Sequence, residues 1–291
     1  MPGDLTSKAI AAQPEWLRQV PERVGDRRLP PDARVLFTGC GTSFHAALAC
    51  GRAAQALDLV QGLDVDADVL VAISHEGGTQ LTLEAVESFP GETWLITGTA
   101  ESKLAAAVDH VVVAAPEIEG SYCHTSSYTS AIAAGRALLG EDVGGLAGLV
   151  EQELATDELP ISTHERFVVA GGAQDLPTVL EAVLKLREGV HVAAESHHME
   201  QLLHGHLAAI DSSVRCFVLE GMGRSAERAQ DVARALGELG CDVALVPTTH
   251  PVVDIVRFQR LTVALAGARG IDPDLIRWDE EPWDRARRSY G

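Results

Sequence analysis

Residues 35–50 read VLFTGCGTSFHAALAC. The run Val35–Thr38 has the composition of a buried strand, and residues 43–57 place alanine and leucine at helical spacing. Between them, Gly39-Cys40-Gly41 supplies the freedom that a tight strand-to-helix turn requires. The order strand, glycine turn, helix predicts a βαβ unit in a parallel sheet.

The same order recurs along the chain. Further strands are expected at Val69–Ile73, Trp94–Thr97, Val111–Ala114, Phe167–Ala170, Cys216–Leu219 and Val243–Val246. Helices are expected over 80–89, 126–139, 175–188, from Gly223 to Leu239 at the latest, and 252–268. The alternation restarts after residue 165, which predicts a duplicated α/β architecture.

We expect five segments along the chain. They are a helical lead-in over 1–27, a first domain over 28–145, a linker over 146–165, a second domain over 166–270 and a tail over 271–291. The linker is rich in glycine and acidic residues, which is typical of a connection between domains. The tail is too polar for a core strand, so we expect it to wrap over a surface.

The composition limits the partners of the chain. Its 291 residues carry 23 Lys and Arg against 42 Asp and Glu, and the formal net charge of −19 would repel nucleic acid and anionic membranes. No run approaches the roughly 18 apolar residues that cross a bilayer. The start, MPGDLTSKAI, lacks the parts of a secretory signal, and five widely spaced cysteines fit a reducing compartment. We therefore expect a cytoplasmic protein.

Two turns place hydroxyl groups where strands are expected to end. Thr42 and Ser43 follow Gly41, and Ser74–Thr79, with the sequence SHEGGT, follows Val69–Ile73. In an open parallel sheet the ligand crevice lies outside the carboxyl ends of the strands, and helix starts attract anions. The alternative is that each is a plain capped turn. Two such turns at one edge favour a shared ligand.

The segment His124–Ser130, HTSSYTS, holds more hydroxyls than one helix cap needs. It is either a capping stretch with surface hydroxyls or a third set of donors for a polyhydroxylated ligand. Glu181, Lys185 and Glu188 are one turn apart on an expected helix, and a solvated Glu–Lys–Glu ladder is the ordinary interpretation of that spacing.

A stretch dense in possible ligands follows that helix. Its acidic and imidazole side chains are His191, Glu195, His197, His198, Glu200, His204 and His206. No recognised metal spacing such as H-E-x-x-H occurs in it. We therefore favour acid–base use of one histidine over a metal site.

Taken together, these residues resemble the sugar isomerase (SIS) family in its double-domain form, and in particular the isomerase half of glucosamine-6-phosphate synthase. Residues 40–43 resemble the C-G-T-S of that family, and Ser74–Thr79 stands in the place of its S-Q-S-G-E-T phosphate loop. The most specific match is 184–211, LKLREGVHVAAESHHMEQLLHGHLAAID, against K-L-K-E, A-E and H-G-P-L-A-x-I-D. The resemblance covers most of the chain. It implies two tandem SIS domains, each a parallel, doubly wound, flavodoxin-like sheet flanked by helices.

The resemblance implies an aldose–ketose isomerase acting on a sugar phosphate or related amino sugar, with base-mediated proton transfer between C1 and C2 and no cofactor or metal. It implies that Glu188 moves the proton, Lys185 assists at the substrate oxygens, and His204 opens the sugar ring from the partner subunit of a homodimer. The substrate-binding residues that it implies are Thr42, Ser43, Ser74, His75, Glu76, Thr79, Thr125, Ser126, Glu195 and Glu200.

Two departures from the family pattern keep other functions open. Glu76 stands where the phosphate loop has a small serine, and a carboxylate about 4 Å from a phosphate costs about 4 kcal/mol per charge pair at a dielectric of about 20. Glu76 must rotate out, be offset by a cation such as protonated His75, or face a ligand end without phosphate. Pro2 follows Met1 where the amidotransferase of the family has its cysteine, so glutamine-dependent amination is not expected. A deaminase or deglycase on the same scaffold and a non-catalytic sugar-phosphate-binding protein are the alternatives.

Overall fold

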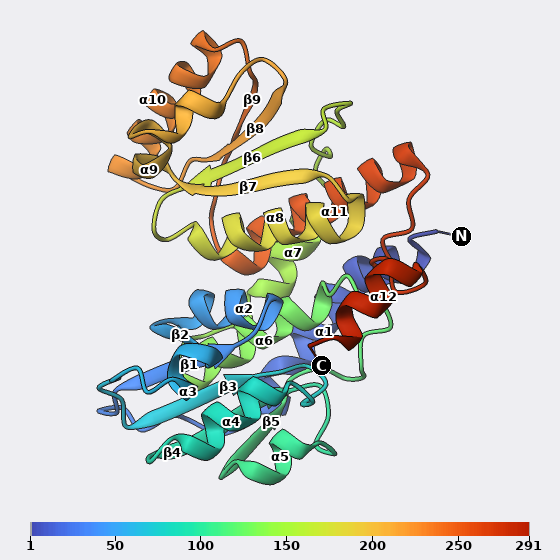
Figure 1. Cartoon of the computed structure of the whole chain (residues 1–291). Coiled ribbons are helices and arrows are strands. Elements are labelled where there is room, and N and C mark those ends of the chain that lie inside the picture. Colours follow the sequence, from blue (N-terminus) through green and yellow to red (C-terminus); the bar gives the residue numbers. More distant parts are fainter. Residues whose placement is uncertain (1, 291) are drawn as a thin grey trace. The chain divides into compact units, whose positions relative to one another are not determined.

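The computed structural model describes residues 2–290 and divides into two compact units (Figure 1). The N-terminal unit comprises Leu5–Gln152 together with the segment from Leu275 onward. The C-terminal unit comprises Glu153–Asp274 together with the segment up to Asp4. Within the described residues, each unit contains one sheet, and every strand pairing in both sheets is parallel.

The sheet of the N-terminal unit has the strand order β2-β1-β3-β4-β5, the flavodoxin-like order. Its strands are β1 (Val35–Gly39), β2 (Ala53–Gln55), β3 (Val69–Ile73), β4 (Glu92–Thr97) and β5 (His110–Val113). The helices of this half of the chain and of the tail are α1 (Asp4–Val24), α2 (Thr42–Cys50), α3 (Ala56–Val60), α4 (Gln80–Ser88), α5 (Lys103–Ala107), α6 (Ser126–Leu138), α7 (Leu146–Leu154) and α12 (Glu281–Arg288).

Both faces of this sheet are covered, which explains its uninterrupted apolar strands. All five residues of β3 are buried. On one face, Leu70 and Leu95 pack with Val86 of α4 and Leu104 of α5. Helices α2 and α6 of the same unit pack against each other. They are so close that a Cβ on Gly135 of α6 would collide with the Cys50 sulfur of α2.

The sheet of the C-terminal unit has the order β7-β6-β8-β9. Its strands are β6 (Arg166–Gly171), β7 (Ala193–His198), β8 (Val214–Leu219) and β9 (Asp242–Val246). The helices are α8 (Leu176–Val190), α9 (Met199–Leu203), the short 3-10 turn η1 (His206–Ala209), α10 (Arg224–Glu238) and α11 (Pro251–Arg269). Helices α9 and α10 cover one face and α8 and α11 the other (Figure 1). On the second face the ring of Phe217 meets that of Phe258, 5.6 Å between centroids.

The seven strands predicted from the sequence are all present, each within two residues of its predicted bounds. The helix predicted over 43–57 is wrong in its second half, because α2 ends at Cys50. The chain then turns at Gly51 and pairs β2 with β1. Strand β7 was not predicted, because its sequence, AAESHH, is not an apolar run; as an edge strand it has partly exposed residues along its length.

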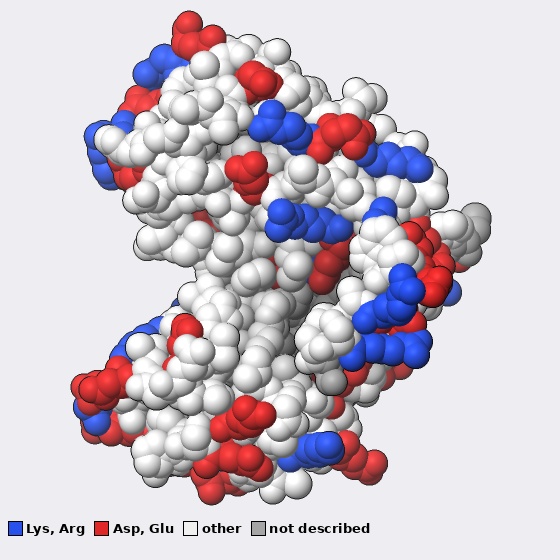
Figure 2. Space-filling view, viewed as in Figure 1, with Lys and Arg blue, Asp and Glu red and all other residues white. Residues whose placement is uncertain are grey.

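The polar tail forms α12 and belongs to the N-terminal unit. Trp278 stacks on Tyr122, 5.2 Å between ring centroids, and the Arg287 guanidinium lies 3.8 Å from the Trp278 ring. All five cysteines are free thiols. Among residues 2–290, no helix is both long enough and apolar enough to span a membrane. On the face shown in Figure 2, acidic and basic side chains are interspersed.

Candidate functional site

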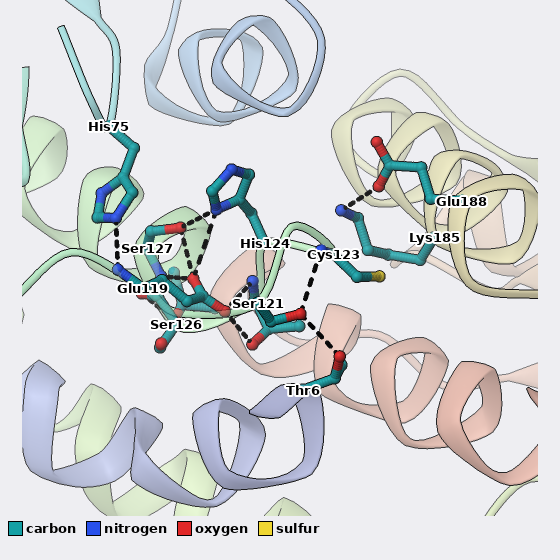
Figure 3. Close-up of polar contacts among 12 residues, drawn as sticks. Thr6, His75, Glu119, Ser121, Cys123, His124, Ser126, Ser127, Lys185 and Glu188 are labelled. Atoms are coloured by element: carbon teal, nitrogen blue, oxygen red, sulfur yellow. Dashed lines mark hydrogen bonds and ion pairs between the residues drawn. The ribbon is translucent and has the colours of Figure 1, made fainter. Parts of the chain in front are cut away.

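Lys185 lies on α8 between two carboxylates and is fully buried. Its Nζ is 2.7 Å from Glu188 Oε2 (Figure 3) and 3.3 Å from Glu181 Oε1. Glu181 is also fully buried, whereas the Glu188 side chain is 23% exposed. The solvated ladder that the spacing favoured is therefore wrong. Burying an ammonium requires paired charge, and Glu188 is the member of this set that reaches solvent.

His204 follows α9 and is strongly exposed, with 73% of its side-chain surface accessible. Its Nε2 lies 3.4 Å from Glu200 Oε2. Arg228 donates to both oxygens of Glu200, at 2.5 and 3.1 Å, and these hydrogen bonds lower the pKa of the Glu200 carboxyl. Glu200 is thus held by Arg228 beside the exposed imidazole of His204.

Strand β7 separates His204 from the α8 pair within the C-terminal unit. Lys185 and Glu188 lie in the last turns of α8, before β7 begins at Ala193, and His204 comes after β7 has ended at His198. Six residues of strand rise about 20 Å. One copy of this unit therefore does not bring His204 and Glu188 together.

Glu195 lies on the exposed β7, where its carboxylate is 3.2 Å from His197 Nε2. The His197 ring in turn lies 4.6 Å from that of His206. Among residues 2–290, no group of three or more His, Cys, Asp or Glu side chains is placed to hold a metal ion.

The two hydroxyl-bearing turns of the N-terminal unit share one edge of its sheet, because β1 and β3 are parallel neighbours. Ser74 is buried, Thr42 and Ser43 are half-buried, and Thr79 is exposed. The contact between Cys40 Sγ and Thr82 Oγ1, 3.7 Å, joins the turn after β1 to the first turn of α4.

Glu119 is a buried carboxylate that the sequence analysis missed. Its Oε1 accepts hydrogen bonds from the backbone N–H and hydroxyl of Thr125, both at 2.8 Å. Its Oε2 accepts from the N–H and hydroxyl of Ser127, at 2.9 and 2.6 Å. Figure 3 shows this arrangement at the start of α6. The hydroxyl proton of Thr125 is thus directed at Glu119, while the buried Ser126 hydroxyl has no hydrogen-bond partner among the described residues.

His75 is held in its neutral form. Its Nε2 accepts a hydrogen bond of 2.8 Å from the backbone N–H of Glu119, and burial lowers its pKa (Figure 3). The suggestion that a protonated His75 offsets Glu76 is therefore wrong, because the nitrogen that would take the proton is already an acceptor. The His75 ring contacts the His124 ring edge-on at 5.4 Å. Glu76 itself is exposed.

Known proteins resemble the chain in sequence. No protein-family model matches it. It is 25% identical over 300 residues to the glutamine–fructose-6-phosphate aminotransferase [isomerizing] of Methanothermobacter thermautotrophicus, and 27% identical over 301 residues to that of Pyrococcus horikoshii. Each match covers 83% of this chain and 50% of the relative. The chain thus spans about half the length of the curated relatives that it matches.

Solved structures resemble the chain along nearly its whole length. Glucosamine-6-phosphate deaminase from Thermotoga maritima superposes with a TM-score of 0.78 at 23% identity, covering 94% of this chain and 97% of that one. The C-terminal domain of glucosamine-fructose-6-phosphate aminotransferase from Francisella tularensis gives 0.78 at 19%, covering 93% and 97%. The chain has the SIS fold. The tagatose-6-phosphate ketose/aldose isomerase of Escherichia coli shares this SIS fold, with a TM-score of 0.78 at 17% identity over 94% and 97%.

Proposed function

We propose that this chain is a sugar-phosphate aldose–ketose isomerase in which each compact unit is one SIS domain. The observation that carries the proposal is the fully buried Lys185 held between Glu181 and the partly exposed Glu188. A buried cation is costly, so its presence on α8 calls for a role beyond packing. The sugar phosphates in the names of similar proteins support this substrate class.

The α8 pair matches the chemistry of the reaction. Aldose–ketose interconversion moves one proton between C1 and C2 through an enediolate. In the proposed mechanism, the Glu188 carboxylate takes the proton from one carbon and returns it to the other. The Lys185 ammonium stabilises the negative charge that develops on the substrate oxygen, and Glu181 compensates the ammonium when no substrate is bound.

We assign the phosphate to the turns of the N-terminal unit. Thr42, Ser43, Ser74 and Thr79 supply hydroxyls at the starts of α2 and α4, where helix N–H groups favour an anion. The exposure of Glu76 reduces the expected repulsion, because a charge pair about 4 Å apart costs about 1 kcal/mol in water against about 4 kcal/mol at a dielectric of about 20.

The remaining assignments rest on the resemblance. We propose that His204 opens the sugar ring in the site of a partner subunit, which makes the enzyme a homodimer. We also propose that the chain works in the cytoplasm and needs no metal or cofactor. Substrate binding stays a prediction for His75, Thr125, Ser126, Glu195 and Glu200. Because His75 and Thr125 each form a hydrogen bond with Glu119, we propose that these two affect substrate binding through Glu119.

Hydrogen exchange at C2 tests the proposal. With glucose 6-phosphate, an aldose that carries a hydrogen on C2, as the probe in deuterated water, the wild-type chain should incorporate deuterium at C2. Glu188→Gln should slow incorporation at least about 100-fold, since a positioned general base contributes about 10²–10⁴-fold. Glu238→Gln, an exposed position on α10, is the matched control. Failure of the wild-type chain to exchange any of several hexose 6-phosphates, or equal exchange by Glu188→Gln, would contradict the proposal.

A deaminase or deglycase is the second candidate, since a glucosamine-6-phosphate deaminase superposes as well as the tagatose-6-phosphate isomerase does, each with a TM-score of 0.78. The same base and ammonium can move the proton that precedes loss of an amine. Release of ammonia from glucosamine 6-phosphate, without interconversion of fructose 6-phosphate, would identify this reaction. Saturable binding of both sugar phosphates with no turnover would identify a non-catalytic binding protein.

A further inference from the structure

A turn of the N-terminal unit is repeated in the C-terminal unit. Residues 39–43 read GCGTS and begin with the last residue of β1, and residues 221–225 read GMGRS and begin two residues after β8 ends. The glycines that precede the two helices have nearly the same backbone angles, φ 56° and ψ −129° at Gly41, and φ 59° and ψ −125° at Gly223. A Cβ on Gly39 would lie 2.9 Å from Ser43 Cβ, and one on Gly221 would lie 2.9 Å from Ser225 Cβ. The second turn therefore repeats the helix-start glycine of the first, although Gly221 has a positive φ of 63° and Gly39, the last residue of β1, does not.

The repeated turn lies where a parallel sheet of this order binds ligands. The chain passes from β6 to β7 on one side of the sheet and from β8 to β9 on the other. The crevice of such a sheet lies outside the carboxyl ends of the two strands where the direction changes, which are β6 and β8. Gly172 follows β6 there, and Gly221–Ser225 follows β8.

A cavity of about 470 Å³ occupies this position. That volume lies within the range of small-molecule pockets. The side chains and glycine that matter for its chemistry are Gly172, His198, Glu200, Arg224, Ser225 and Arg228.

One side of the cavity suits an anion. The Arg224 side chain is 80% exposed and forms an ion pair with Glu227 on the same helix. An exposed ion pair contributes little stability, so the Arg224 guanidinium can leave Glu227 and bind a phosphate instead. The Ser225 hydroxyl oxygen has no hydrogen-bond partner among the described residues. It lies against Gly172 and Gly221, where an added Cβ would come within 2.5 and 2.7 Å of it, so the hydroxyl has to rotate to donate to a phosphate in the cavity. Arg224 and Ser225 stand in the first turn of α10, a helix of 15 residues whose N-terminus adds positive potential.

The other side suits hydroxyl groups. Glu200 is fixed there by Arg228, which donates to both carboxylate oxygens. A carboxylate accepts hydrogen bonds from sugar hydroxyls, but it repels a second anion. The lining of the cavity thus offers both a cation for an anionic group and a carboxylate for hydroxyl groups.

We propose that the C-terminal unit binds a phosphorylated polyol in this cavity, with its phosphate on Arg224, Ser225 and the start of α10 and its hydroxyls toward Glu200. The site is separate from Lys185 and Glu188, which lie in the last turns of α8, before β7 begins. Glu200 is also among the substrate-binding residues predicted for the isomerase, but phosphate binding at Arg224 does not depend on the proposed isomerase activity.

Residue-resolved NMR titration of the full chain tests the site. The probe is sorbitol 6-phosphate, a polyol phosphate with no carbonyl to isomerise, and sorbitol and inorganic phosphate are titrated separately. Saturable shifts are expected at the amides of Gly221–Ser225. Arg224→Ala should weaken them at least about tenfold, the value of one charge-assisted hydrogen bond. Arg234→Ala, on the same helix but paired with Asp231 and not lining the cavity, is the matched control and should leave them unchanged.

Several results would overturn the proposal. Shifts with inorganic phosphate that Arg224→Ala does not weaken would indicate an adventitious ion only. Equal shifts with unphosphorylated sorbitol would remove the role of Arg224. Shifts confined to Thr42, Ser43 and Ser74 would support the phosphate site of the proposed function and exclude this one. Conversely, shifts at Gly221–Ser225 in a chain that shows no C2 exchange would support this site while the isomerase proposal fails.

Discussion

At the residue scale, Lys185 and Glu119 show how the chain accommodates a buried charged group. Lys185 is paired with carboxylates on its own helix, and Glu119 accepts four hydrogen bonds from Thr125 and Ser127. Both depend on partners that are near in sequence. A charge that is fully satisfied locally can be buried with little distortion of the surrounding core.

Glu119→Gln should destabilise the chain by about 2–4 kcal/mol, because an amide group turns one acceptor into a donor that faces the N–H and hydroxyl of Ser127. Urea denaturation, followed by circular dichroism, measures the loss. Glu117→Gln, two residues away and exposed, should change stability by less than about 0.5 kcal/mol. A loss below about 1 kcal/mol for Glu119→Gln would show that the carboxylate does not organise the start of α6.

The sequence predicted the candidate site only in part, and burial explains the difference. The spacing of Glu181, Lys185 and Glu188 is the same on an exposed ladder and on a buried one, so packing against other elements decides between them. Glu119 lies in no recognisable motif. The excess of hydroxyl groups over residues 124–130 was a signal that could have indicated it, because buried hydroxyls need a hydrogen-bond acceptor. A protonated His75 was one of the alternatives for offsetting Glu76, but its Nε2 accepts from an N–H that is 44 residues away in the sequence, which spacing does not reveal.

At the scale of elements, apolar strands were predictable and edge strands were not. A strand that is covered on both faces, such as β3, buries every side chain and therefore has a continuous apolar sequence, which makes it recognisable. Strands β2 and β7 are edge strands, and pairing with β1 and β6 fixes them more than their own sequences do. The predicted helix over 43–57 is wrong beyond Cys50 for the same reason. Hydrogen bonding of β2 to β1 outweighs the helical propensity of the alanines in that segment.

The packing of α2 on α6 gives a prediction about a pair of residues. Gly135→Ala should cost about 1–2 kcal/mol, because overpacking against Cys50 costs about 1–3 kcal/mol and the helix regains up to about 1 kcal/mol from alanine. Adding Cys50→Ala should remove the collision, so the double variant should be more stable than the sum of the single losses by about 1 kcal/mol or more.

Equilibrium denaturation of the four chains measures this coupling. Gly135→Ala combined with Cys241→Ala, in the C-terminal unit, is the control and should be additive. Additive losses for Gly135 and Cys50 would contradict the close approach of the two helices.

The start of α11 gives a prediction about pH. Asp254 is buried and accepts hydrogen bonds from the N–H and hydroxyl of Thr249, and burial raises its pKa to about 6. The unfolded chain releases this proton near pH 4, so between about pH 4 and 6 the folded chain alone keeps it, and stability falls as pH rises. Two units of pKa correspond to about 3 kcal/mol.

Asp254→Asn keeps the Oδ1 acceptor and removes the titration. Its stability relative to wild type should therefore increase by up to about 3 kcal/mol as pH rises from about 4 to 7. Urea midpoints at unit steps of pH measure this difference. Asp32→Asn, at an exposed position, should show little such trend. A difference that is independent of pH would mean that Asp254 titrates normally.

At the scale of the whole molecule, the two units repeat one plan with different chemistry. Each sheet places its first strand beside its third, and each has a glycine turn with a positive φ at the start of a helix. The N-terminal turns carry hydroxyls, whereas the C-terminal turn carries Arg224. Gene duplication preserves a backbone more readily than it preserves side chains, so ligand specificity can differ between units that share a fold.

Subunit complementation tests the shared site at this scale. Glu188 comes before β7 in the chain and His204 comes after it, so one chain does not supply both residues to the same site. A complete site therefore needs Glu188 from one subunit and His204 from its partner. Glu188→Gln and His204→Asn should each inactivate the homodimer. In a mixed dimer the two changed residues fall in one site, and the other site is intact. Random exchange makes about half the dimers mixed, so mixing equal amounts should restore about a quarter of wild-type activity. If differently tagged subunits exchange but activity stays at the level of the separate variants, His204 does not act across subunits.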